Sequence, residues 1–150
     1  MLAICIPWYQ KSQFIDVAIN SIKAQTKEDF RCFIRDDSSD DGSIDRLRSM
    51  VHDDFRFHVD QNAVNMGPVI NTIRVVNDAV QTGADIIALM DCDDYIAPQC
   101  VERLNWFYSQ PPYKGYVYTQ MHVCWPGGAD QQVCFNRGIP LGRSALYDHI

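Results

Sequence analysis

The chain has 150 residues, of which 13 are basic and 19 are acidic, so its formal net charge at pH 7 is −6. A chain of this length is about one domain and buries roughly 68–70% of its unfolded surface, so we expect a single domain over residues 1–150. An acidic chain without a cluster of Lys and Arg lacks the electrostatic footprint of a nucleic-acid-binding protein. We therefore expect neither a nucleic acid nor an anionic membrane as its partner.

The N-terminal segment predicts a cytoplasmic protein. Residues 1–7 contain an apolar stretch of strand length but no basic region, so they lack the layout of a signal peptide. No segment of the sequence is apolar over enough residues to span a membrane. We expect a protein without a transmembrane segment.

Strand-like and helix-like segments alternate along the chain. This pattern is typical of a doubly wound α/β domain, Rossmann-like, with a mostly parallel sheet and helices on both faces. Strands are expected at residues 2–6, 30–35, 56–59, 85–90 and within 115–123, with 85–90 as the central strand. Helices are expected at about residues 12–25, 44–51, 69–83 and 98–107.

The most unusual feature is the apolar run at residues 86–90, which ends in Asp91, Cys92, Asp93 and Asp94. Three carboxylates at the end of one strand repel one another unless a cation lies among them. Mg²⁺ and similar hard cations prefer carboxylate oxygens. The sequence therefore predicts a site for a metal ion and phosphate at this strand end.

A second acidic segment follows the strand expected at 30–35, where Asp36 and Asp37 precede a Ser- and Asp-rich stretch. Asp40 or Asp41 in this stretch is suited to cap the next helix, because its oxygen accepts from free backbone N–H groups. Ligands of open α/β sheets bind outside the carboxyl ends of the strands. Unusual residues follow four of the expected strands there: Pro7 to Tyr9, Asp36 and Asp37, Asn65 and Gly67, and Asp91 to Asp94.

The order and spacing of these strand ends resemble the inverting glycosyltransferases of family 2, which have the A-type nucleotide-sugar-binding fold. Residues 4–10 are similar to the opening strand of that family with its Pro-x-Tyr-Asn, although Gln10 replaces the usual Asn. Gln25 and Thr26 match its Gln-Thr. Residues 30–43 resemble its Val-Asp-Asp-Gly-Ser segment, with Ser38 in place of Gly and Arg35 in place of an apolar residue.

The later motifs continue the resemblance over roughly the first 110 residues. Asn65 to Gly67 matches an Asn-x-Gly, and residues 89–94 followed by Pro98 match Leu-Asp-x-Asp-Asp and its trailing Pro. Members often carry an Arg on the helix after Asn-x-Gly, but Thr72 stands at that position here and Arg74 lies two residues later. Contact of Arg74 with a diphosphate is therefore not expected from the motif.

The resemblance implies roles for individual residues. Pro7 and Tyr9 would line the nucleobase pocket, and Asp37 would accept the imide N–H of uracil, which favours uridine nucleotides. Asn65 and Gly67 would belong to the same donor site, or they only form the turn. A second group would serve the sugar and phosphates: Asp91 would meet the ribose or a metal-bound water, and Asp93, with Asp91, would hold Mn²⁺ or Mg²⁺ against the two phosphates.

Inverting transfer also needs a general base for the acceptor hydroxyl. Beyond Asp94 the acidic candidates are Glu102 in a helix, Asp130 in an apparent hairpin turn and Asp148, of which Asp148 is the only plausible base. The chain is expected to stop just short of the region that carries the base in this family, so the fold would be short at its C-terminus. Two interpretations follow: a metal-dependent transferase moving sugar from a nucleotide-diphosphate sugar to an unknown acceptor, or a donor-binding module without activity of its own.

Overall fold

The computed structural model describes residues 1–111, 115, 121–124 and 130–133. The chain forms two compact units, Met1–Tyr113 and Lys114–Ile150. A single domain over residues 1–150 therefore stays a prediction.

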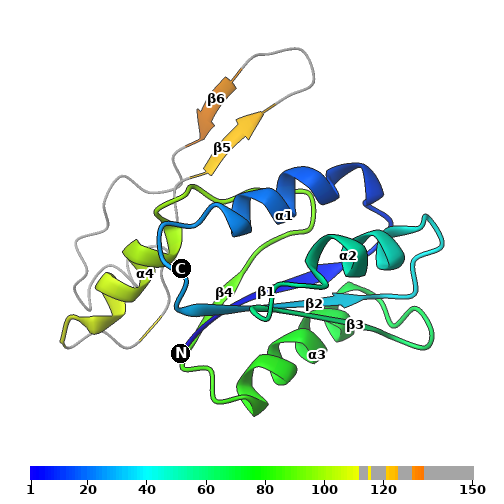
Figure 1. Cartoon of the computed structure of the whole chain (residues 1–150), viewed down its shortest axis with the longest axis horizontal. Coiled ribbons are helices and arrows are strands. Elements are labelled where there is room, and N and C mark those ends of the chain that lie inside the picture. Colours follow the sequence, from blue (N-terminus) through cyan, green and yellow to red (C-terminus); the bar gives the residue numbers. More distant parts are fainter. Residues whose placement is uncertain (112–114, 116–120, 125–129, 134–150) are drawn as a thin grey trace, which may run out of the picture. The chain divides into compact units, whose positions relative to one another are not determined.

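The first unit contains a parallel sheet of four strands in the order β3-β2-β1-β4 (Figure 1). The strands are β1 Leu2–Trp8, β2 Phe30–Asp36, β3 Phe57–Gln61 and β4 Ile86–Leu89. Because Leu2 pairs with both Phe30 and Ile86, the strands start nearly level, and their carboxyl ends lie at one edge. The chain winds in one direction from β1 to β3 and then crosses to the other side of β1, which places the topological switch point between β1 and β4.

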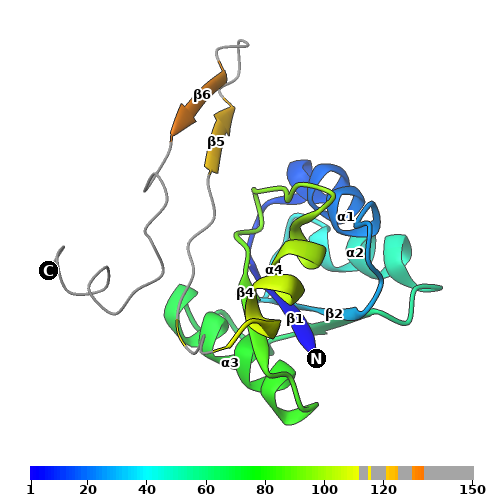
Figure 2. The ribbon, with the colours of Figure 1, turned by 90° about the vertical axis from the view of Figure 1, so that its left-hand side faces the viewer.

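Helices cover both faces of this sheet, which confirms the predicted α/β class. Figures 1 and 2 show α1 and α2 on one face and α3 on the other. The helices are α1 Ile15–Lys23, preceded by the 3₁₀ turn η1 Ser12–Phe14, α2 Ser43–Val51, α3 Pro68–Gln81 and α4 Cys100–Ser109. Within the part of the chain that is described, no helix is both long and apolar enough to cross a membrane.

The second unit contains an antiparallel hairpin of β5, Met121–Cys124, and β6, Asp130–Val133. Met121 pairs with Val133, and Cys124 pairs with Asp130. The predicted strand within 115–123 is thus met in part by β5, while residues 116–120 lie outside the described residues.

The alternation of side chains along β1 creates two apolar clusters. Leu2, Ile4, Ile6 and Trp8 point to the larger cluster, which also receives residues of α1, α2 and α4. The smaller residues Ala3 and Cys5 face α3, where Phe33, Val75 and Ala79 complete the second cluster. Truncating one fully buried isoleucine of the larger cluster to alanine is expected to cost about 2–5 kcal/mol.

Among the described residues, β1 and β2 are the central strands of the four-stranded sheet and β4 is its outer strand beside β1. For this part of the chain, the prediction that residues 85–90 form the central strand is wrong. Leu89 is 60% exposed, and Ile86 to Ala88 are only partly buried. An apolar run shows that a segment forms a strand but does not determine its neighbours, which is why the strand was assigned to the wrong position.

Helix α3 turns a partly polar side toward the sheet. Its buried residues are Asn71, Val75 and Ala79, whereas the larger apolar residues Val69 and Ile73 are at least half exposed. The Nδ2 of Asn71 donates to the backbone carbonyl of Arg35 over 2.9 Å, so the sheet offers a polar partner at this point. The apolar periodicity of a helix therefore locates the helix more reliably than it locates the buried side.

Candidate functional site

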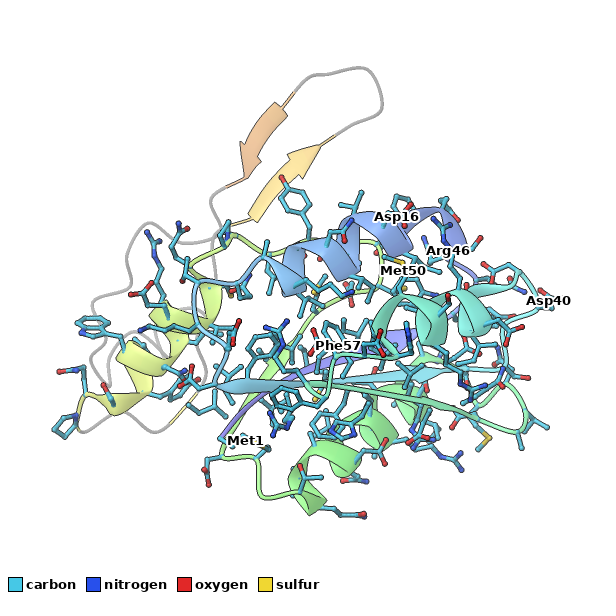
Figure 3. The ribbon with its side chains drawn as sticks, viewed as in Figure 1. Met1, Asp16, Asp40, Arg46, Met50 and Phe57 are labelled. Atoms are coloured by element: carbon cyan, nitrogen blue, oxygen red, sulfur yellow. The ribbon has the colours of Figure 1, made fainter. Side chains whose placement is uncertain are left out.

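The loop after β1 is fastened to the loop after β2. The backbone N–H of Gln10 donates to Oγ of Ser39 over 2.9 Å, and the side-chain amide of Gln10 donates to Asp40 over 2.8 Å. Asp40 lies at the outer end of its loop (Figure 3). Gln10 and Ser38 have φ values of 48° and 63°, the left-handed region that residues other than glycine seldom adopt. Two of the departures from the family motifs, Gln10 and Ser38, are therefore held in unfavourable backbone conformations.

Asp36 and Asp41 shape the turn that leads into α2. The carboxylate of Asp36 is fully buried and accepts from the backbone N–H and the hydroxyl of Ser39. Asp41 accepts from the backbone N–H of Ser43, the first residue of α2, and from the N–H of Ser12. Burial acts to raise the pKa of Asp41, but the hydrogen bonds from Ser43 and Ser12 outweigh it and lower the pKa. The prediction that Asp40 or Asp41 caps α2 is wrong, because the N-cap is Gly42, which makes no side-chain cap hydrogen bond. Asp41 accepts the first N–H of the helix from the position before the cap, and Asp40 binds Gln10.

Asp37 organises the loop before α3. Its Oδ1 accepts from Nδ2 of Asn62 over 2.7 Å and from the N–H of Met66 over 2.9 Å, and its Oδ2 accepts from the N–H of Gly67 over 2.8 Å. The same Gly67 N–H also reaches Oδ1 of Asn65 at 3.0 Å. Gly67 has a φ of 80°, which a side chain would strain. The structure thus brings Asp37, Asn65 and Gly67 together, with Asp37 only 2% exposed.

A buried polar network continues from this loop to α3. Nδ2 of Asn62 also donates to Asn71, and its Oδ1 accepts from Arg74 over 2.9 Å and from Arg35 over 3.3 Å. Arg35 in turn forms an ion pair with Asp78 of α3 at 2.7 Å. These contacts explain the polar residue at position 35, which ties β2 to α3.

The acidic segment after β4 lies beside the end of β1. Asp91, Asp93 and Asp94 are all exposed, and the Nζ of Lys11 donates to Oδ2 of Asp93 over 2.8 Å. This hydrogen bond lowers the pKa of Asp93. Burial, followed by the charges of Asp91 and Asp93, raises the pKa of Asp94. Lys11 is not among the residues predicted from the sequence, although its position two residues after Tyr9, at the switch point, was an available signal.

Cys92 connects the same two strand ends. Its burial raises the pKa of the thiol, while a hydrogen bond from the backbone N–H of Tyr9 acts in the opposite direction. The Tyr9 side chain is 42% exposed, and Pro7 is partly buried within β1. Tyr9 and Asp93 therefore follow neighbouring strands at the switch point, where an α/β sheet binds its ligands.

The carboxylates of this segment fit a divalent cation that arrives with phosphates. Among the described residues, no group of three His, Cys, Asp or Glu side chains is placed to hold a metal ion. Mg²⁺ commonly binds through one or two carboxylates together with substrate phosphates rather than in a cage of protein ligands. Asp91 and Asp93 offer two exposed carboxylates of this kind.

Gln25 holds the segment that follows the carboxylates. Its side-chain amide is 6% exposed, donates to the carbonyls of Ser21 and Ala97, and accepts from the N–H of Val101 over 3.0 Å. The N–H of Thr26 donates to the carbonyl of Pro98 over 2.8 Å. The Gln-Thr pair therefore fastens the start of α4 to the end of α1, a role that the motif alone did not reveal.

Of the three candidate bases, Glu102 is the one within the described residues of the first unit. Asp148 lies outside the described residues, and Asp130 begins β6 in the second unit. Glu102 is in α4 and accepts from the hydroxyl of Thr26 over 3.1 Å. Its carboxylate is therefore engaged in the contact between α4 and the end of α1.

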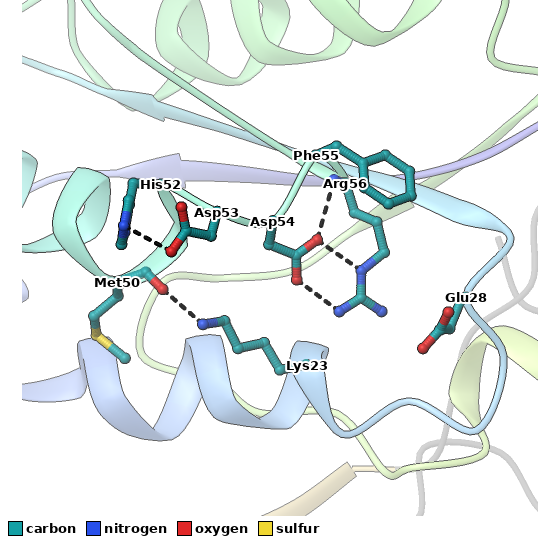
Figure 4. A pocket seen from close by; sticks show the side chains of 8 residues that line it. All are labelled: Lys23, Glu28, Met50, His52, Asp53, Asp54, Phe55 and Arg56. Atoms are coloured by element: carbon teal, nitrogen blue, oxygen red, sulfur yellow. Dashed lines mark hydrogen bonds and ion pairs between the residues drawn. The ribbon is translucent and has the colours of Figure 1, made fainter.

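A hollow of about 330 Å³ lies at the opposite edge of the sheet, near the starts of β2 and β3 (Figure 4). Its two principal cations already have partners within the protein. The Nζ of Lys23 donates to the carbonyl of Met50 over 2.6 Å, and Arg56 forms two hydrogen bonds with the carboxylate of Asp54. The hollow is thus a poor candidate for a phosphate site.

Comparisons with known proteins agree with this geometry. The sequence pattern of Glycosyl transferase family 2 matches residues 3–144. An uncharacterized glycosyltransferase of Haemophilus influenzae is 27% identical over 104 residues, which are 69% of this chain and 31% of that protein.

Two groups of solved structures share the fold. The S. aureus protein TarS, residues 1–349, in complex with UDP has a TM-score of 0.65 at 21% identity, covering 72% of this chain and 32% of that one. The mannosyltransferase PcManGT of Pyrobaculum calidifontis in complex with GDP-Man and Mn²⁺ has a TM-score of 0.62 at 17% identity, covering 73% and 32%. The matched part thus spans about a third of the length of each of these two chains, and 19% of a longer TarS chain.

The fold is that of the A-type nucleotide-sugar-binding class, with the polar residues gathered at the carboxyl edge of its parallel sheet. With its sequence pattern matched over nearly the whole chain, the protein belongs to glycosyl transferase family 2.

Proposed function

We propose that this chain forms the donor-binding part of an inverting, metal-dependent glycosyltransferase that uses a nucleotide-diphosphate sugar, with a UDP-sugar favoured. The observation that carries the proposal is the convergence of Tyr9, Asp37 and the Asp91 to Asp94 segment at the carboxyl edge of the sheet. Solved structures that share the fold include TarS in complex with UDP-GlcNAc and PcManGT in complex with GDP-Man and Mn²⁺. These complexes support a nucleotide-sugar ligand.

In this proposal the nucleobase lies at the ends of β1 and β2. The exposed ring of Tyr9 offers an apolar face for the base, and Pro7 lines the inner side. A carboxylate has about four acceptor positions, and three of those on Asp37 are used by the loop at 62–67. The remaining position would accept the imide N–H of uracil, with Asn65 and Gly67 as the adjoining wall.

The ribose and diphosphate lie toward β4 in the same proposal. Asp91 would accept from the ribose hydroxyls or from a metal-bound water, and Asp93 would hold Mn²⁺ or Mg²⁺. The cation supplies Lewis-acid stabilisation of the departing diphosphate. The chain itself orients these carboxylates, because Gln25 fixes the backbone that follows them through Ala97 and Val101.

The acceptor and the base define the second candidate function. We assign the base to Asp148 on sequence grounds alone, and the acceptor is a hydroxyl compound of unknown structure. Glu102, the acidic residue of α4, accepts from the hydroxyl of Thr26 at the contact between α4 and the end of α1. This observation favours the alternative of a donor-binding module that binds the nucleotide-sugar without transferring the sugar.

Calorimetric titration of the chain with UDP, CDP and GDP, each with and without Mn²⁺, tests the donor site. We expect binding that requires Mn²⁺ and is strongest for UDP, because cytosine lacks the imide N–H that Asp37 accepts. Equal binding of UDP and CDP would contradict the role of Asp37. The absence of Mn²⁺-dependent binding of any of the three would contradict the proposed function.

Release of UDP from UDP-sugars, measured on the same samples, separates the two candidates. Turnover that is lost in Asp148→Asn, while UDP affinity is kept, is the result expected for the transferase. Binding without turnover is the result expected for the module.

A further inference from the structure

Lys11 occupies an unusual place in the donor site. It follows β1, whereas its partner Asp93 follows β4, so their ion pair crosses the switch point between the two strands. The Nζ of Lys11 lies 2.8 Å from Oδ2 of Asp93 and 5.5 Å from the centre of the Phe14 ring. Asp93 is also the side chain proposed to hold the divalent cation.

The electrostatics of the acidic segment explain why a cation is needed there. Asp91, Asp93 and Asp94 lie within four consecutive residues, and none of these four residues is a Lys or an Arg. The ion pairs of the described residues place one cation against this segment, Lys11. Its ammonium therefore offsets the repulsion while no ligand is bound.

The ion pair between Lys11 and Asp93 can be broken at a small cost in free energy. Its side chains are 38% and 40% exposed, and ion pairs at such positions contribute little to stability because water screens them. A Lys ammonium is a point charge on a flexible stem of four carbons, so it can leave one oxygen for another at small cost. A divalent cation on Asp93 would repel the ammonium, and a diphosphate beside it would attract it.

We propose that Lys11 is a tethered counter-ion: it neutralises Asp93 in the empty site, yields Asp93 to the divalent cation, and then pairs with the diphosphate of the donor. This inference rests on the proposed function. It predicts opposite effects of Lys11 on two ligands, since the residue competes with the metal ion alone but assists the nucleotide that carries the metal.

Two matched variants test this exchange. Lys11→Met removes the counter-ion, and Lys27→Met makes the same change of charge at an exposed position in the loop before β2. Electron paramagnetic resonance of free Mn²⁺ gives the affinity for the metal alone, and calorimetry gives the affinity for UDP in saturating Mn²⁺. Thermal unfolding followed by circular dichroism checks that both variants fold.

We expect Lys11→Met to change both the affinity for Mn²⁺ alone and the affinity for UDP in Mn²⁺, and Lys27→Met to change neither. Mn²⁺ alone should bind about two- to fivefold more tightly, because an exposed ion pair no longer competes. UDP with Mn²⁺ should bind about tenfold more weakly, because a charge-assisted contact with the diphosphate is lost.

Failure of this inference and failure of the proposed function give different results. If the wild-type chain binds UDP with Mn²⁺ but Lys11→Met matches Lys27→Met in both titrations, Lys11 is an ordinary surface ion pair. If both affinities fall in Lys11→Met, the competition is contradicted. If neither the wild-type chain nor the variants bind UDP with Mn²⁺, the proposed function itself is contradicted.

Discussion

The two ends of the parallel sheet are built differently. At the amino ends of the strands, Arg56 and Asp54 are paired in a site where their side chains are only 10% and 18% exposed. At the carboxyl ends, Asp91 and Asp94 are exposed, and the side chains of the Lys11–Asp93 ion pair are 38% and 40% exposed. The Arg56–Asp54 pair is satisfied within the protein, whereas the acidic segment leaves carboxylates that a ligand can use.

Backbone conformation follows the same division. Gln10 and Ser38, the two residues other than glycine with positive φ among those described, both lie at the carboxyl end. Unfavourable conformations of this kind persist where surrounding contacts hold them, and they concentrate at functional sites. The comparison therefore assigns stability to one end of the sheet and binding to the other, and variants at each end can test it.

The largest expected effect is on stability at the amino end. Asp54→Ala leaves the guanidinium of Arg56 buried without its charged partner, and Nη1 of Arg56 already has no hydrogen-bond partner among the described residues. We expect the free energy of unfolding to fall by about 3 kcal/mol in a urea titration, while UDP affinity stays at the wild-type value. A loss below 1 kcal/mol would mean that this end of the sheet is not stabilised by the pair.

The same ion pair predicts how stability depends on pH. The hydrogen bond from Arg56, opposed by burial, lowers the pKa of Asp54. A carboxyl group with a lowered pKa in the folded state stabilises the protein above its unfolded pKa of about 3.9 and loses that contribution as the pH falls through the folded pKa. The wild-type chain should therefore lose stability below about pH 4 more steeply than Asp54→Asn. Urea titrations of both proteins between pH 3 and pH 6 give the free energy of unfolding at each pH. An equal dependence of that free energy on pH in the two proteins would contradict this assignment.

Gln25→Ala is expected to affect both stability and binding. The change leaves the carbonyl of Ala97 and the buried N–H of Val101 without their side-chain partner, which should cost about 2 kcal/mol in the free energy of unfolding. Because this backbone follows the Asp91 to Asp94 segment, UDP affinity in Mn²⁺ should fall as well. Gln99→Ala is the matched control, since Gln99 is exposed and its side chain makes no capping hydrogen bond. Equal behaviour of the two variants would exclude a positioning role for Gln25.

The smallest expected effects come from the two unfavourable conformations at the carboxyl end. Gln10→Asn and Ser38→Gly introduce residues that adopt positive φ more readily, so each should raise the free energy of unfolding by about 0.5–1 kcal/mol. Ser49→Gly provides the control, because the same substitution within α2 should lower stability by a similar amount. A loss of stability in both loop variants would show that these conformations are not strained.

The sequence predicted where the strands and helices lie in the chain better than it predicted which of them lie side by side in the fold. The first three strands and the four helices were located within a few residues, because apolar periodicity and turn residues act locally. The position of β4 beside β1, as the outer strand of the described sheet, depends on strand order, which no local pattern contains. The exposed side of α3 depends in the same way on the carbonyls that Asn71 meets in the sheet.

The candidate site was predicted in part for a similar reason. The strand ends that carry Tyr9, Asp37 and Asp93 were identified from the order of the motifs. Contacts between segments far apart were not predicted: Lys11 meets Asp93 across 82 positions, and Gln25 meets Ala97 across 72. The buried position of Asp37 under the loop at 62–67 likewise arises from residues that come together only in the folded chain.

The most direct test of the central claim is the Mn²⁺ dependence of UDP binding in Asp93→Ala, compared with Asp53→Ala. Asp53 lies at the amino end and its side chain is 86% exposed, so its removal makes the same change of charge away from the proposed site. We predict that Mn²⁺ strengthens UDP binding to the wild-type chain and to Asp53→Ala at least tenfold, and that this gain is lost in Asp93→Ala. A full gain in Asp93→Ala would contradict the assignment of the metal and donor site to the carboxyl edge of the sheet.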